Sequence, residues 1–233
     1  YRPDNAVLAL AGNYDWEKVV SLAEEYLGPW LEGEHTAAYR TKSAKPQTIR
    51  REKDIEQLHL TLGFPGIAQD PDEIYLMSIL NSVLGGAMSS RLFQSIREER
   101  GLAYTVYSYP ASYSDSGLFA IYAGTSLEHG AQVLQLIRQE VDKILRDGLT
   151  PQEFEQARAQ LKGSYILGLE STSSRMNALG RRKLLLGNEQ TEEEVIAKID
   201  AITYDSVMDV TRRILSAKPS YALVGKGAEG LEV

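Results

Sequence analysis

Hydrophobic and polar residues alternate along residues 58–64, and this alternation constrains the fold more than any other feature of the chain. Leucine or phenylalanine occupies every second position from Leu58 to Phe64, and His59 is the first of the intervening residues. Successive side chains of a strand point to opposite faces of its sheet, so the pattern predicts a strand with one buried face. His59 is expected to point away from that face.

Three further segments are expected to be strands. Residues 104–109 and 118–123 are predicted to form an antiparallel hairpin, because the turn-forming residues 114–117 separate them. The last apolar run, 221–224, predicts a further strand. Together with residues 58–64, these segments predict an α+β fold in which an antiparallel or mixed sheet is covered by helices on one face. The order of the strands is not fixed by the sequence.

Capping residues predict helices between and after these strands. Most of the predicted helices begin at Asp, Ser or Thr, and most end at Gly. The expected helices begin at Asp15, at the box Asp70-Pro71-Asp72-Glu73, at Ser89 or Ser90, near Ser126, at the box Thr150-Pro151-Gln152-Glu153, before Met176, at Thr191 and at Thr203.

A basic residue and a proline precede an apolar run at both ends of the chain. Arg2-Pro3 leads into residues 6–11, which are expected to form a buried strand, and Lys218-Pro219 leads into residues 221–224. If this similarity is an internal repeat, each copy marks the end of one half of a duplicated protein. Chance similarity between two buried strands is the alternative. Because the chain starts at Tyr1 rather than Met, we expect it to be a piece of a longer protein.

Composition and charge exclude several classes of partner and chemistry. The 25 Lys and Arg residues are outnumbered by 32 Asp and Glu residues and form no long cluster, which argues against nucleic acid or an anionic membrane as partner. The absence of cysteine excludes disulfides, cysteine-based zinc sites and a thiol nucleophile. No apolar run approaches the roughly 20 residues of a spanning helix, and no signal-peptide pattern is present. We therefore expect no membrane targeting and a cytoplasmic location.

Local catalytic motifs are absent from the sequence. His35, His59 and His129 are too far apart for either His-Glu-x-x-His or His-x-x-Glu-His, and no Gly-x-Ser-x-Gly occurs. The most distinctive stretch is 84–104, where Gly85-Gly86 precedes a predicted helix. Such glycines can cradle an anion or let a peptide backbone come close, but without further context the pattern favours a helix-turn-helix corner with glycine as C-cap.

Residues 84–104 closely resemble the hallmark of the C-terminal half of the pitrilysin/insulinase-type zinc metallopeptidases, the inverted zincins. The resemblance extends over essentially the whole chain. It implies that residues 1–30 are the strand and helix that end the preceding, zinc-bearing half, that 31–48 are a linker, and that 49–233 are the non-zinc half. The residues that carry it are Leu84-Gly85-Gly86-Ala87-Met88-Ser89-Ser90-Arg91-Leu92-Phe93-Gln94, followed by Arg97 and Tyr104.

This family places two homologous α/β halves around a chamber like a clamshell, with the zinc, the glutamate base and His-x-x-Glu-His in the first half. The resemblance implies zinc in the full-length protein and no metal in this chain. It maps Arg97 and Tyr104 onto an Arg and a Tyr that reach the substrate peptide beside the zinc, where their donors stabilise the oxyanion. For Tyr104 the alternative is a strand residue packed in the hairpin, and for Arg97 a surface ion pair.

The glycine-rich loop of the family corresponds to Gly85 and Gly86, with Ala87 in place of a third glycine that relatives often carry. The resemblance implies substrate-binding contacts at Gly85, Gly86, Met88 and Ser89. A family-independent alternative for residues 85–91 is a generic anion-binding module.

The function implied by the resemblance is that of the substrate-binding half of a zinc metalloendopeptidase, a hydrolase that processes unfolded peptides or presequence-like segments. This chain alone is expected to be inactive. Its expected partners are the peptide substrate and the N-terminal zinc-bearing half, and a homodimer or a heterodimer is compatible with that role. The alternative is a non-catalytic structural or peptide-recognition subunit of the same family.

Overall fold

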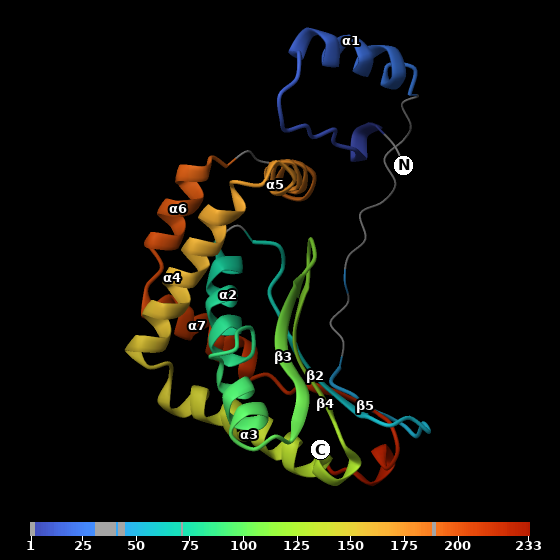
Figure 1. Cartoon of the computed structure of the whole chain (residues 1–233), viewed down its shortest axis with the longest axis vertical. Helices are drawn as coiled ribbons and strands as arrows, with labels where there is room; N and C mark the ends of the chain where they lie inside the picture. Colours follow the sequence, from blue (N-terminus) through green and yellow to red (C-terminus); the bar gives the residue numbers. More distant parts are fainter. Residues whose placement is uncertain (1–2, 31–40, 42–44, 71, 188–189) are drawn as a thin grey trace. The chain divides into compact units, whose positions relative to one another are not determined.

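The computed structural model describes residues 3–30, 41, 45–70, 72–187 and 190–233 (Figure 1). The chain divides into two compact units. The smaller unit comprises Tyr1–Arg40 and Lys162–Ala197, and the larger unit comprises Thr41–Leu161 and Lys198–Val233. Most of the predicted linker and Pro71 of the predicted capping box lie outside the described residues, and the predicted domain boundaries stay a prediction.

The larger unit contains a five-stranded mixed sheet. Its strands run in the order β1-β5-β2-β4-β3, with β1 parallel to β5 and the other neighbours antiparallel. The predicted hairpin and the predicted strands near 58 and 221 are confirmed. The strands are β1 (Thr48–Arg51), β2 (Leu58–Pro65), β3 (Ala103–Ser112), β4 (Gly117–Thr125) and β5 (Ser220–Val224).

Side-chain caps begin several of the helices, as the sequence predicts. Thr150 and Glu153 each accept a hydrogen bond from the other's backbone N–H, and Thr191 and Glu194 do the same. The helices are α1 (Trp16–Leu27), α2 (Glu73–Leu84), α3 (Gly130–Asp147), α4 (Pro151–Gly168), α5 (Thr172–Leu186), α6 (Glu192–Asp200) and α7 (Tyr204–Leu215), with the short elements η1 (Pro3–Asn5), η2 (Phe93–Glu98), η3 (Leu127–His129) and η4 (Ala228–Gly230).

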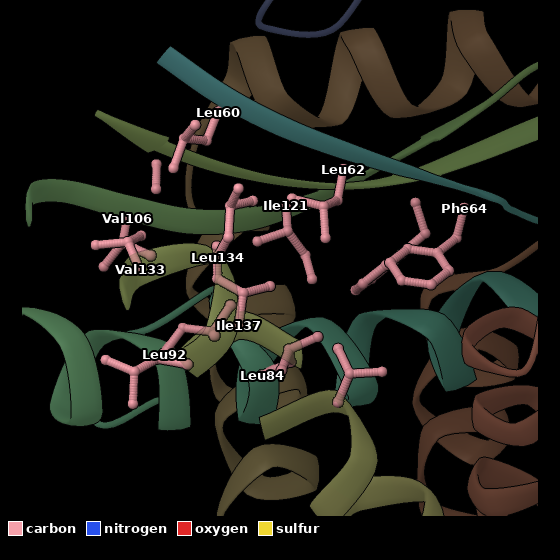
Figure 2. Packing of buried hydrophobic residues seen from close by; sticks show 14 of the residues in the cluster. Leu60, Leu62, Phe64, Leu84, Leu92, Val106, Ile121, Val133, Leu134 and Ile137 are labelled. Carbon is pink, nitrogen blue, oxygen red and sulfur yellow. The ribbon is translucent and has the colours of Figure 1, made fainter. Parts of the chain in front are cut away.

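One face of the sheet is buried under helices, as the alternation in β2 predicts. The leucines and the phenylalanine of β2 are at most 3% exposed, and α2, α3 and α7 contribute side chains to the same core. Figure 2 shows Leu62 of β2 and Ile121 of β4 facing Leu134 and Ile137 of α3. The fold is therefore α+β, with helices covering one face of a mixed sheet.

The opposite face of the sheet carries aromatic and polar side chains. His59 points to it, as expected, and its Nδ1 lies 2.7 Å from the hydroxyl of Tyr122 on β4. The Tyr122 ring stacks on that of Tyr107 with centroids 5.2 Å apart. Burial, followed by the proximity of Tyr107, raises the pKa of the Tyr122 phenol.

The prediction of a strand at residues 6–11 is wrong. These residues have no regular structure, and Leu8 is 59% exposed. A strand requires a partner for its backbone groups, and the described residues supply none to this segment. The converse holds for β1, which is exposed along its whole length, has Ile49 as its one apolar residue, and is defined by its pairing with β5 rather than by a hydrophobic pattern.

The helices of the described ranges include none with the combination of length and apolar character that crossing a bilayer requires.

Candidate active-site rim

The turn at Gly85 and Gly86 packs directly against the edge of β3. Both glycine N–H groups donate to the carbonyl of Asn81 in α2, and Ser108 of β3 donates its N–H to the Gly85 carbonyl at 3.2 Å. A Cβ atom on Gly85 would lie 2.5 Å from the Ser108 nitrogen, and one on Gly86 would lie 2.5 Å from Asn81 Nδ2. Close packing therefore explains both glycines, and their contact with a peptide stays a prediction.

A buried polar pair secures this turn, and the sequence analysis missed it. Ser108 is 3% exposed, and its hydroxyl donates to Asn81 Oδ1 at 2.7 Å. The bond joins the last turn of α2 to the edge strand of the sheet. An amide side chain one turn before two glycines, in a largely apolar helix, is the signal that points to Asn81.

Arg97 lies in a π-helix, where the sequence predicts an ordinary helix. In η2 the N–H of Glu99 donates to the carbonyl of Gln94, five residues earlier. The Ser90 hydroxyl, predicted as an N-cap, has no hydrogen-bond partner among the described residues. Leu92 and Ile96 are fully buried, whereas the side chain of Arg97 is 36% exposed. Single π-turns recur at functional sites.

Tyr104 lies at a β-bulge at the start of β3. Ala103 pairs with Thr125, and Thr105 pairs with Gly124. The two partners are consecutive on β4, whereas one extra residue lies between Ala103 and Thr105 on β3, which is the pattern of a β-bulge. Tyr104 is the additional residue and its side chain is 77% exposed. The alternative in which Tyr104 packs within the hairpin is therefore wrong.

The side chains of Arg97 and Tyr104 contact each other. The guanidinium carbon of Arg97 lies 4.7 Å from the centroid of the Tyr104 ring and 4.8 Å from that of Phe93. Its Nε atom is 3.9 Å from a carboxylate oxygen of Glu98, too far for a hydrogen bond. The aromatic contacts thus place the guanidinium beside the Tyr104 ring, with the Glu98 ion pair as a loose secondary contact.

A shallow pocket adjoins the pair. It has a volume of about 260 Å³ and brings Arg97 together with three of the four residues predicted to bind substrate. Neither the fourth, Ser89, nor Tyr104 lines it, and Tyr104 is connected to the pocket only through its contact with Arg97. The lining residues are Gly85, Gly86, Ala87, Met88, Phe93, Arg97, Thr105, Val106 and Tyr107.

A half-buried ion pair connects the segment before Arg97 to the helices behind it. Arg91 donates to both carboxylate oxygens of Glu153 at 2.7 Å and to the Gly148 carbonyl at 3.0 Å. The hydrogen bond to Glu153 raises the pKa of Arg91. Burial acts to raise the pKa of Glu153, but hydrogen bonds from Arg91 and the Thr150 backbone outweigh it, so this pKa lies below its usual range. Sequence analysis missed the pair because 62 residues separate its members.

The described residues do not form a zinc site. They contain no group of three or more His, Asp or Glu side chains arranged to hold a metal ion. His59 is engaged with Tyr122, and the Nδ1 atom of His129 lies 3.1 Å from the Ser126 hydroxyl. His35 lies outside the described residues. The His, Asp and Glu side chains of the described residues therefore do not fit a zinc ion.

Comparisons with known proteins agree with this fold and sequence pattern. Residues 1–161 match the family model described as the peptidase M16 inactive domain. The chain is 38% identical to the uncharacterized zinc protease YmxG of Bacillus subtilis over 224 residues, which are 96% of this chain and 54% of that protein. It is also 38% identical to the uncharacterized zinc protease SCO5738 of Streptomyces coelicolor, covering 97% of this chain and 51% of that protein. The chain thus spans about half the length of these curated relatives.

Solved structures show the same fold. The crystal structure of a peptidase M16 inactive domain from Pseudomonas fluorescens matches with a TM-score of 0.83 and 24% identity, over 92% of this chain and 52% of that chain. A chain of complex III2 from Candida albicans matches with a TM-score of 0.81 and 20% identity, over 95% of this chain and 55% of that chain.

Proposed function

Because the chain belongs to the M16 peptidase family and matches its inactive domain, we propose that it is the substrate-binding half of a zinc-dependent metalloendopeptidase. The observation that carries the proposal is the contact between Tyr104 and Arg97, which lines a shallow pocket together with Gly85, Gly86 and Met88. The metal belongs, in this proposal, to an N-terminal half outside this chain.

Arg97 and Tyr104 supply hydrogen-bond donors beside the reacting carbonyl. A guanidinium and a phenol both donate to oxygen, and neither needs to change its protonation state to do so. Donors fixed before reaction stabilise the negative charge that develops on the carbonyl oxygen in the transition state. The π-helix, the bulge and the ring contact hold these donors in place, which supports this role.

The proposed substrate class follows from the groups to which Arg97 and Tyr104 would donate hydrogen bonds. Backbone carbonyls of folded proteins are nearly all engaged in hydrogen bonds, so only an extended or unfolded segment presents one to Arg97. A pocket of about 260 Å³ accommodates a side chain and its neighbouring backbone but not a folded surface. Unfolded peptides are therefore the proposed substrates.

Complementation tests the proposed function. A quenched fluorescent peptide is incubated with zinc and with this chain, with the separately produced N-terminal half, or with both. We expect cleavage only in the mixture, because each half supplies part of the site. If a zinc-loaded N-terminal half stays inactive when this chain is added, the enzymatic proposal fails and a role as a non-catalytic recognition subunit replaces it.

Residues 1–30 are proposed to belong structurally to the preceding half. Within the smaller unit, Trp16 is 66% and Tyr26 is 71% exposed, and a largely apolar pocket of about 670 Å³ lies along residues 7–28. Exposed apolar surface of this kind marks an interaction site. Its proposed occupant is the N-terminal half.

Tryptophan fluorescence tests this docking. Trp16 and Trp30 are the two tryptophans of the chain, and adding the N-terminal half is expected to shift the emission to shorter wavelength as Trp16 leaves water. The variant Trp16→Phe should lose most of the shift while retaining the Trp30 signal. A mixture that cleaves peptide without any shift would contradict the placement of residues 1–30.

A further inference from the structure

Arg91 joins three separate elements behind the pocket. It lies two residues before η2, which carries Arg97. Its guanidinium binds the Gly148 carbonyl, just after the end of α3, and the carboxylate of Glu153, in the first turn of α4. The side chains of Arg91 and Glu153 are 16% and 27% exposed, so water competes only weakly for these bonds.

The ion pair fixes orientation as well as distance. Two parallel N–H···O bonds from a planar guanidinium to a carboxylate allow a narrow range of geometries, which a lysine ammonium does not reproduce. Glu153 is itself held in place, because its Oε2 atom also accepts the N–H of Thr150 at 2.7 Å. The start of the Arg97 segment is thus tied to the rigid α3–α4 corner.

The segment needs such a tie because π-helical hydrogen bonding is rarely stable in isolation. At its far end the Gly101 N–H donates to the Arg97 carbonyl, and the Leu102 N–H donates to the Ile96 carbonyl. Arg91 provides the corresponding restraint at the near end. A shift at this end would move the Arg97 guanidinium relative to the Tyr104 ring.

We propose that Arg91, held by Glu153, is a positioning residue that sets the placement of Arg97 at the pocket. This proposal rests on the proposed function and extends it to a residue that touches neither pocket nor substrate. A displacement of about 1 Å at a reacting centre lowers rates by up to about 100-fold. Loss of the bidentate geometry should therefore reduce kcat without a matching rise in KM.

The test compares Arg91→Lys with Arg158→Lys in the two-half assembly. Arg158 is a matched control, because it also bridges a glutamate of α4, Glu155, and a backbone carbonyl, that of Ile202, without contacting the Arg97 segment. We expect Arg91→Lys to lower kcat about 10- to 100-fold with KM within about threefold, and Arg158→Lys to change neither. Glu153→Gln, which keeps the volume of the side chain, should behave like Arg91→Lys.

Hydrogen exchange of the chain alone separates this proposal from the proposed function. In Arg91→Lys the amides of residues 93–102 should exchange faster while those of β2 and β4 stay protected, and Arg158→Lys should leave residues 93–102 unchanged. Unaltered exchange, or an unaltered kcat in an active assembly, would overturn the proposal. If the wild-type assembly cleaves nothing, the proposed function fails, whereas unaltered exchange in Arg91→Lys overturns the restraint of the segment by Arg91 independently of any activity.

Discussion

Replacement of Arg97 by alanine is expected to lower kcat/KM of the two-half assembly by about 100- to 1,000-fold, the effect of removing one preorganised donor to a developing oxyanion. Most of the loss should fall on kcat, because the donor matters more in the transition state than in the bound substrate. Tyr104→Phe removes only a hydroxyl and keeps the ring against the Arg97 side chain. It should therefore lower kcat with little change in folding.

Arg146→Ala is the matched control for Arg97→Ala. Arg146 is also an exposed arginine of the larger unit, and it pairs with Asp147 at 2.8 Å. It lies at the end of α3 and does not line the pocket, so kcat/KM should stay within about twofold of wild type, as for surface substitutions in general. Equal activity of Arg97→Ala and Arg146→Ala would remove Arg97 from the site.

Ile121→Ala is expected to destabilise the larger unit by about 2–5 kcal/mol, the usual cost of truncating a buried aliphatic side chain to alanine. Ile121 is fully buried in β4, and its neighbours on the adjacent strands are Leu62 and Ser108. The cavity would open between the sheet and α3. A small domain is stabilised by about 5–15 kcal/mol in total, so this loss would be a large fraction of the whole.

Urea unfolding of the isolated chain measures this loss. Both tryptophans lie in the smaller unit, so circular dichroism and tyrosine emission, rather than tryptophan emission, should follow the larger one. Ile49→Ala makes the same change at a site on β1 that is 59% exposed, and should cost less than about 0.5 kcal/mol. Equal costs for the two variants would show that the sheet core does not depend on the packing of β4.

The sequence predicted correctly those elements whose formation depends on residues that are close together in the chain. The alternation in β2 depends on one buried face, and the boxes at Thr150 and Thr191 depend on hydrogen bonds across three residues. Neither requires knowledge of the rest of the chain. The strand predicted at residues 6–11 was wrong for the opposite reason, because pairing depends on a partner that an apolar run does not specify.

The site was predictable only in part. The resemblance supplied the spacing of Arg97 and Tyr104, but neither the π-helix nor the bulge follows from local propensity, since both depend on how the segment meets the rest of the sheet. The Arg91–Glu153 and Asn81–Ser108 contacts join residues 62 and 27 positions apart. A single sequence contains no signal for such pairs beyond the polarity of each member.

Because of the bulge, the proposed role of Tyr104 in catalysis is independent of the pairing that stabilises the sheet. Because the additional residue lies outside the regular pairing and its side chain is exposed, substitutions there leave the buried register of β3 intact and cost little folding free energy. Under the proposed function, a single substitution at Tyr104 would therefore lower activity in a copy that still folds. If the proposed function holds, a duplicate of this half that carries such a substitution would lose one donor in a single evolutionary step and keep its fold.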